Sequence, residues 1–243
     1  MSTYLFPVPA VPSLTVRGVN LQFPVRRIYC VGRNYAEHAK EMGFEPDREA
    51  PFFFAKPADA VVPDGATIPY ALATGNLHHE MELVVAIGKP GVNIPRERAL
   101  DHVYGYAAGL DMTRRDLQLA ARDKGRPWDV GKGFDQSAPI GALRRVTEIG
   151  HPTRGSIQLE VNGELRQQAD LSQLIWSVAE LVAELSKLFV LVPGDVLFTG
   201  TPAGVGPVKP GDRLRGSIEG VGELTVSIAP RTEGLLPEGA SGS

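Results

Sequence analysis

Two acidic residues stand at the entrance of an apolar strand pattern. In residues 78–88, HHEMELVVAIG, one residue separates Glu80 from Glu82, and an unbroken apolar run follows. Because side chains alternate across a β-strand, both carboxylates point to one face while Met81 points to the other. A buried strand tolerates two carboxylates only where a cation compensates them. The pattern therefore predicts a cation site, or else acids at an exposed edge or beside arginines.

Turn residues punctuate the rest of the chain. The 27 glycines and 20 prolines are scattered along the 243 residues, above the average usage of about 7% and 5%. This scatter favours a strand-rich fold with few long helices. The predicted strands are 26–32, 51–57, 78–88 and 104–111, with a hairpin at 156–168 around Asn162–Gly163 and a strand after each of the turns 192–195 and 209–212. The predicted helices are 34–43, 95–103, 112–125 and 172–189, the third opening on a Thr113–Asp116 capping box.

No linker divides these patterns, so the sequence predicts one strand-dominated α+β domain with peripheral helices. We expect that domain to span 26–230, after a proline-rich arm at 1–25 and before a loose tail at 231–243.

Charge and composition narrow the partners. A net charge of −3 and a pI near 6.0 argue against nucleic acid. No apolar stretch approaches the ~20 residues of a membrane span, and the opening residues do not read as a signal peptide. The single cysteine, Cys30, excludes an intrachain disulfide and favours a reducing, cytoplasmic location.

A third acid ends another strand pattern. Asp111 closes YGYAAGLD where the pattern changes from strand to helix, and a helix cap is its ordinary alternative role. Three carboxylates would suit a hard cation such as Mg²⁺ or Mn²⁺. His78 and His79 lie close by in the sequence, which leaves zinc open. Spacing alone does not show that the three acids meet.

A histidine and a glutamate form a candidate catalytic pair. His38 and Glu41 are three residues apart and share a face if 34–43 is helical. A carboxylate beside an imidazole raises the imidazole pKa and fixes its tautomer, so the pair can take a proton from water. An exposed surface pair is the alternative. Arg33 follows a strand end and could meet an anionic substrate, or could simply be solvated.

Two glycine-rich segments could approach a ligand closely. In GKGFDQSAPIG, Lys132 stands between two glycines, although an exposed lysine in a turn would look the same. FTGTPAGVG, 198–206, offers backbone amides and the hydroxyls of Thr199 and Thr201 to an oxyanion. It lacks the Gly-Lys-Ser/Thr ending of a phosphate loop, and glycine-rich turns are common.

Together these stretches resemble the fumarylacetoacetate hydrolase family. The resemblance covers about residues 26–225 in family order and rests on YCVGRNYAEHAKEMG, PFFFAKPADAVV, NLHHEMELVVAIG, GLDMTRRDLQ, GRPWDVGKGFDQSAPIG, VNGELRQ and VPGDVLFTGTPAGVGPVKPGD. It implies a mixed β-roll of the family's C-terminal-domain type, commonly a homodimer. It also implies one divalent cation per chain, Mg²⁺ or Mn²⁺.

The resemblance assigns roles to particular residues. Glu80, Glu82 and Asp111 would be the metal ligands. The catalytic residues would be His38 and Glu41, on a lid, together with Lys132. The substrate-binding residues would be Arg33, Lys56, Gln118, Gly200 and Thr201.

The implied activity is hydrolysis of the C3–C4 bond of a small-molecule 2,4-diketo acid. The opening segments look most like members that cleave fumarylpyruvate to fumarate and pyruvate in gentisate breakdown. Relatives with the same metal motif include acylpyruvases, oxaloacetate decarboxylases and dioate isomerases. A non-catalytic protein that binds a metal or a dicarboxylate is the alternative from another class.

Overall fold

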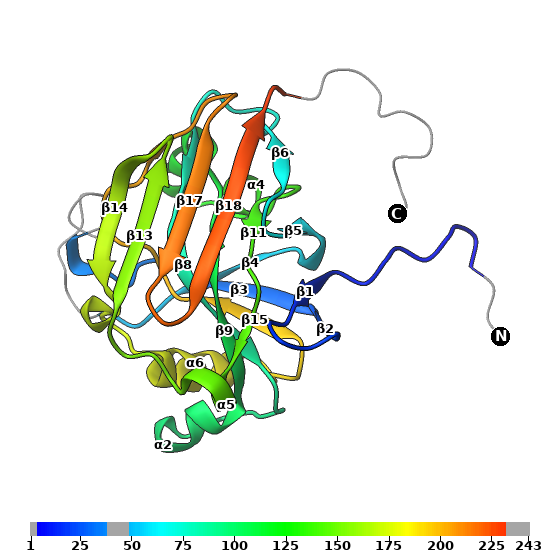
Figure 1. Cartoon of the computed structure of the whole chain (residues 1–243), viewed down its shortest axis with the longest axis vertical. Helices are drawn as coiled ribbons and strands as arrows, with labels where there is room; N and C mark the ends of the chain where they lie inside the picture. The colour runs from blue at the N-terminus through cyan, green and yellow to red at the C-terminus, as the bar shows by residue number, and fades with distance from the viewer. Residues whose placement is uncertain (1–3, 38–48, 232–243) are drawn as a thin grey trace.

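The computed structural model describes residues 4–37 and 49–231, and two open β-sheets form its body (Figure 1). The six-stranded sheet runs β12 (Arg144–Arg145), β9 (Val103–Leu110), β8 (Met81–Ile87), β15 (Asp195–Phe198), β3 (Arg27–Val31) and β4 (Phe53–Lys56). The five-stranded sheet runs β14 (Glu164–Asp170), β13 (Ser156–Val161), β17 (Arg213–Ile218), β18 (Gly222–Ala229) and β6 (Thr67–Pro69). Each sheet contains one parallel pair, β15 with β3 and β18 with β6.

Short strands and helices surround the two sheets. The short strands are β1 (Ser13–Thr15), β2 (Gln22–Pro24), β5 (Val61–Val62), β7 (Leu77–His79), β10 (Thr113–Arg114), β11 (Ala138–Pro139) and β16 (Gly206–Pro207). The helices are η1 (Ala58–Ala60), α2 (Arg96–Ala99), η2 (Leu100–His102), α3 (Arg115–Asp123), α4 (Asp129–Lys132), α5 (Val146–Ile149), η3 (Leu171–Gln173) and α6 (Val178–Leu188). Within the described ranges, no helix has the length and apolarity needed to cross a membrane. The predicted strand-dominated α+β fold is confirmed.

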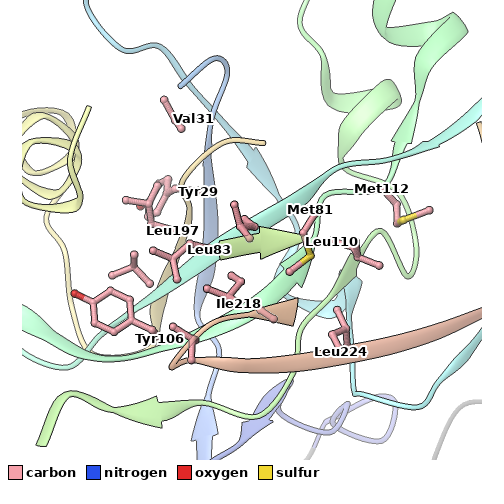
Figure 2. Packing of buried hydrophobic residues seen from close by; sticks show 14 of the residues in the cluster. Tyr29, Val31, Met81, Leu83, Tyr106, Leu110, Met112, Leu197, Ile218 and Leu224 are labelled. Carbon is pink, nitrogen blue, oxygen red and sulfur yellow. The ribbon is translucent and has the colours of Figure 1, made fainter. Parts of the chain in front are cut away.

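Strand β8 is buried throughout because both of its faces are covered, and it is apolar from Leu83 onward. Leu83 and Val85 belong to the larger core, which also receives Leu159 and Val226 from the five-stranded sheet. Val84, on the opposite face, belongs to a second cluster. Figure 2 shows part of the larger core. The unbroken apolar run of the sequence therefore marks a strand buried on two sides.

The second cluster draws on the segment expected to be an N-terminal arm. Strands β1 and β2 pair antiparallel, and their Leu14 and Phe23 are buried in that cluster together with Val16 and Val25. Residues 13–25 thus pack on the six-stranded sheet, whereas the large apolar side chains of residues 4–11 are exposed.

Several predicted boundaries were wrong. The strand expected at 78–88 breaks at Glu80 into β7, which pairs with β10 and β16 in a separate three-stranded sheet, and β8 of the six-stranded sheet. The helix expected at 112–125 begins only at Arg115, after the two-residue strand β10. Its expected capping box does not form, because the Thr113 hydroxyl donates to the carbonyl of Asp111 and the Asp116 carboxylate accepts from Thr74 and Gly75.

The long helix expected at 172–189 also starts late. Residues Leu171–Gln173 form a 3₁₀ turn, and α6 begins after Ser177, whose hydroxyl and Glu180 form a capping box. A local cap therefore overrode the apolar spacing that extended the prediction toward residue 172. Most of the helix expected at 34–43 lies outside the described residues.

The hairpin turn at Asn162–Gly163 is confirmed. Strands β13 and β14 pair antiparallel on either side of it, and both turn residues have positive φ, 55° at Asn162 and 82° at Gly163. Two consecutive left-handed residues are the geometry of a tight hairpin turn that matches the twist of the strands.

We expect Gly163→Ala to lower the free energy of unfolding by about 1–2 kcal/mol, the cost of a left-handed alanine. A Cβ at Gly163 would meet nothing within 4 Å, so the cost is backbone strain alone. Gly75→Ala is the matched control, since Gly75 is equally open but lies outside the left-handed region. Urea unfolding of both variants checks this. Equal losses at the two positions would contradict the expectation.

Candidate active site

Alternation along two neighbouring strands separates the acids from the larger core. Met81 pairs with Leu110 across β8 and β9. Met81, Leu110 and Met112 lie together at one end of the larger core (Figure 2). Glu82 and Asp111 alternate with these residues and therefore face the other side.

Three carboxylates meet on that side. One ligand oxygen from each of Glu80, Glu82 and Asp111 lies within 4.8 Å of the other two. Each of these residues is at most 4% exposed. The backbone N–H of Asp111 donates to the carbonyl of Glu80 at 2.9 Å, which joins the strand ends that carry the acids. The spacing left open whether these acids meet, and the fold brings them together.

Two buried lysines compensate this charge. The Lys132 ammonium donates to Glu80 Oε2 at 2.7 Å, to Asp111 Oδ2 at 2.8 Å and to Thr113 Oγ1 at 2.8 Å. Lys56 Nζ lies 2.8 Å from Asp111 Oδ1. Lys132 ends the short helix α4 and is 2% exposed, so the alternative of an exposed turn lysine is excluded.

Arg115, which the sequence analysis did not assign, is the third buried cation. Its guanidinium donates to Glu80 and to the side-chain oxygen of Gln118. Arg115 opens α3, while its neighbour Arg114 instead lies over the ring of Phe134, with 4.4 Å between the Arg114 Cζ and the ring centroid. Two adjacent arginines in MTRRD were the available signal. Only the start of the helix at Arg115 decides which of them turns inward.

Burial and mutual repulsion set the protonation of the site. Burial raises the pKa of Glu82 well above its usual range, and the charges of Asp111 and Glu80 raise it further. A hydrogen bond of 2.6 Å from the Gly200 N–H to Glu82 Oε2 acts in the opposite direction. Burial lowers the pKa of Lys132, but attraction to Asp111 and Glu80 outweighs burial, so that pKa is raised. Lys132 therefore stays charged.

The glycine-rich loop after β15 contacts the acidic strand through its first residues. Gly200 has φ +96°, and a Cβ there would lie 2.7 Å from the Cβ of Asn34, so this position requires glycine. The hydroxyl of Thr201 donates to the carbonyl of Met81 at 2.8 Å. The Thr199 hydroxyl donates to the carbonyl of Leu83 at 2.9 Å.

The two neighbouring histidines hydrogen-bond to side-chain amides and not to the three carboxylates. His78 Nε2 lies 2.9 Å from Asn76 Oδ1, and His79 Nδ1 lies 3.1 Å from Gln167 Oε1. Burial, followed by the charge of Arg115, lowers the pKa of His78 to about 4. Burial also lowers the pKa of His79. In the part of the chain that the structure describes, the candidate metal cluster contains carboxylates only.

The remaining predicted residues fall into two groups. Lys56, Gln118 and Thr201 are buried around the triad. Arg33 is partly exposed, 3.6 Å from a carboxylate oxygen of Glu49, and its Cζ lies 5.5 Å from the ring centroid of Phe52. The predicted pair His38 and Glu41 lies outside the described residues.

The donor set fits a hard divalent cation. All three groups are carboxylates, and they are buried close enough to share one ion. Asp111 Oδ1, although close to Lys56, accepts no hydrogen bond of good geometry from the described residues. A buried carboxylate oxygen that accepts no hydrogen bond has lone pairs available to coordinate a metal ion.

The fold and the site define a class of protein in which an open, mixed β architecture carries a buried, all-oxygen carboxylate cluster able to hold a divalent cation. Residues 27–229 match the family model described as Fumarylacetoacetate (FAA) hydrolase C-terminal. The chain belongs to the fumarylacetoacetate hydrolase family, as the sequence motifs indicated.

Individual relatives cover three quarters of this chain or more. A solved fumarylpyruvate hydrolase from Pseudomonas aeruginosa, in complex with Mn²⁺ and pyruvate, is 58% identical with a TM-score of 0.91, over 94% of this chain and all of that one. Fumarylpyruvate hydrolase of a Ralstonia species is 47% identical over 182 residues, 75% of this chain and 94% of that protein. The mitochondrial oxaloacetate tautomerase of Homo sapiens is 42% identical over 203 residues, 84% of this chain and 91% of that protein.

We expect Lys132→Met to destabilise the metal-free protein by about 3–5 kcal/mol, because removing one partner leaves the other buried charges uncompensated. The matched control is Lys187→Met. Lys187 also pairs with a carboxylate, Nζ to Glu184 Oε1 at 2.6 Å, but its side chain is 57% exposed. That pair is worth at most about 1 kcal/mol. Urea unfolding with a chelator present compares the two, and equal stabilities would contradict the assigned charge compensation.

Proposed function

We propose that this chain is a metal-dependent hydrolase that cleaves the C3–C4 bond of fumarylpyruvate, releasing fumarate and pyruvate. The observation that carries the proposal is the buried cluster of Glu80, Glu82 and Asp111, with the Lys132 ammonium against two of the three acids. The 58% identity to a fumarylpyruvate hydrolase solved with Mn²⁺ and pyruvate supports the ion and one product.

Charge balance supports an anionic substrate. When all three carboxylates are ionised, the three buried cations Lys56, Arg115 and Lys132 match their charge. A bound divalent cation makes the site positive, and fumarylpyruvate carries two carboxylates. Held by the triad, Mg²⁺ or Mn²⁺ would supply Lewis-acid polarisation of the keto acid oxygens.

The chain's own residues provide the proton transfers and the charge stabilisation. In this proposal His38, oriented by Glu41, takes a proton from water as the water oxygen bonds to C4. The C3–C4 electron pair then passes to the pyruvate fragment as its enolate, and the proton that His38 took from water is returned to C3. Lys132, whose ammonium contacts two of the acids, would stabilise the developing enolate charge by its own positive charge.

Substrate contacts are proposed for the residues around the cluster. Arg33, whose side chain is 25% exposed, would meet the distal fumaryl carboxylate. The other proposed contacts are Lys56, Gln118, Gly200 and Thr201. All four are buried, Gly200 and Thr201 donate to Glu82 and Met81, Lys56 donates to the Met112 carbonyl and Gln118 accepts from Arg115, which supports a rigid binding wall.

Oxaloacetate is a second candidate substrate. The 42% identity to a human oxaloacetate tautomerase favours it, because the same cluster would bind either keto acid. Decarboxylation of oxaloacetate would leave the same enolate without attack by water. A protein that binds metal and keto acid without turnover is the remaining alternative.

Three further properties are proposed alongside the activity. We propose a place in gentisate breakdown, a cytoplasmic location and a homodimer. The single cysteine, buried and reduced, supports a reducing compartment. The exposed side chains of Tyr4, Leu5 and Phe6 support association with a second copy. Light scattering of the full chain tests the dimer, and the mass of one chain would contradict it.

We expect fumarylpyruvate to be consumed faster than oxaloacetate with Mn²⁺ or Mg²⁺ present, and chelator to abolish both reactions. Loss of the conjugated enol absorbance and appearance of fumarate measure cleavage. His38→Ala should lower kcat for hydrolysis by about 10²–10⁴-fold, the usual contribution of a general base. Wild-type turnover by His38→Ala would exclude the base. Mn²⁺ binding without turnover of either acid would leave the non-catalytic alternative.

We expect Mn²⁺ affinity to rise as the pH increases above the ordinary pKa of a glutamate, because burial raises the pKa of Glu82 and the ion competes with its proton. The raised pKa of Glu82 also means that the metal-free folded protein binds more protons than the unfolded chain, so its contribution to stability falls as pH rises. Calorimetry in buffers of different ionisation enthalpy measures the released proton. Glu184→Gln is the control with unchanged affinity, whereas a pH-independent affinity in the wild type would refute this assignment.

A further inference from the structure

The backbone of Met81 is held by side chains on both of its polar groups. Met81 follows Glu80, the residue at which the predicted strand breaks between two sheets. Its N–H donates to Gln167 Oε1 at 3.0 Å, and its carbonyl accepts from Thr201 Oγ1 at 2.8 Å. Met81 lies between Glu80 and Glu82. The position of its backbone therefore determines where the side chains of the two glutamates start.

A single buried carboxamide connects these contacts. Gln167 is 1% exposed, and its Nε2 donates to Thr201 Oγ1 and to the carbonyl of Pro202, both at 2.8 Å. Its Oε1 accepts from Met81 and lies 3.1 Å from His79 Nδ1. A primary amide has two donor hydrogens and two acceptor lone pairs, so Gln167 uses its full capacity. Since the Met81 N–H can only donate, the orientation of the amide is determined, and His79 Nδ1 carries a proton.

The polarity of Gln167 has no packing explanation. It is the only fully buried residue of β14, and Leu165, which is separated from it by a register shift in the β13–β14 pairing, is 52% exposed. A position that only fills the core would favour an apolar side chain, since burying an amide is costly unless every group is bonded. The strand buries the amide of Gln167 and exposes the side chain of Leu165. The hydrogen bonds of Gln167, and not apolar packing, therefore account for its burial.

We propose that Gln167 is a positioning residue that sets the geometry of Glu80 and Glu82 for a divalent cation. Through Met81 it holds the strand that carries both acids. Through Thr201 it holds the loop whose preceding residue, Gly200, donates its N–H to Glu82 at 2.6 Å. The motif VNGELRQ, which belongs to the five-stranded sheet, thereby acts on a cluster carried by the six-stranded sheet. This inference rests on the proposed function only in that the cluster binds a divalent cation.

Calorimetric titration of the full chain with MnCl₂, without substrate, tests the proposal. We expect Gln167→Met, which keeps the length of the side chain and loses its hydrogen bonds, to weaken Mn²⁺ affinity by about 10–100-fold. Ser186→Ala is the matched control. Ser186, in α6, is also fully buried. Its hydroxyl accepts from the Ile94 N–H and donates to the Ala183 carbonyl, and neither of these partners belongs to the triad. Its loss should lower stability while leaving the affinity unchanged.

A second variant tests the same contact from the other side. Thr201→Val keeps the shape of the side chain but removes the hydroxyl that joins Gln167 to the Met81 carbonyl, so it should also weaken Mn²⁺ binding, whether or not Gln167→Met folds. Because both residues act through Met81, the double variant should be weakened by less than the product of the two single effects. Fully multiplicative losses would overturn the shared mechanism.

The outcomes separate this inference from the proposed function. A wild-type chain that binds no Mn²⁺ refutes the metal-dependent activity itself. A wild-type chain that binds Mn²⁺, with Gln167→Met or Thr201→Val binding equally well, overturns only the positioning role. Equal weakening by Ser186→Ala would likewise overturn it, since the loss would then follow from stability alone.

Discussion

The repulsion among three buried carboxylates is the constraint on which the rest of the structure depends. Oxygens of Glu80, Glu82 and Asp111 lie within 4.8 Å of one another, a separation at which each pair of charges costs roughly 3.5 kcal/mol at an effective dielectric constant near 20. The fold compensates this repulsion with buried cations on the same cluster, above all Lys132, and burial raises the pKa of Glu82. A divalent ion would compensate the repulsion among the carboxylates more completely. The same repulsion that destabilises the metal-free chain therefore favours binding of a divalent cation.

The strands that carry this cluster also build the core. On β8 and at the end of β9, the residues that alternate with the acids enter the larger core, as Met81 and Leu110 do. A shift of one residue in either strand would place carboxylates among the core side chains, so packing enforces the register that the site needs. Gln167 adds a constraint on orientation that packing alone does not provide. Its hydrogen bond orients the Met81 backbone where the chain passes from the three-stranded sheet to the six-stranded sheet.

Sequence patterns succeeded where the signal is local and failed where partners are distant. The Asn162–Gly163 turn was predictable because two adjacent residues determine it. The Thr113 cap was predicted but does not form, because the Thr113 hydroxyl donates to the Asp111 carbonyl and accepts from Lys132, a residue of another element. Arg115 was not predictable for the same reason, because nothing in MTRRD distinguishes the arginine that bonds to Glu80 from its neighbour Arg114.

The sequence by itself determined the strand-rich class, the family, and the alternation of Glu82 with Met81 and Leu83, because periodicity and motif order are properties of the chain alone. Only the tertiary structure decided that Asp111 meets Glu80 and Glu82, that Lys132 and Arg115 neutralise them, and that an amide from the other sheet holds Met81. The physical reason is that burial and hydrogen-bond geometry depend on which segments become neighbours in space. Residues such as Gln167 and Met81, 86 positions apart along the chain, acquire a relation only when the sheets pack.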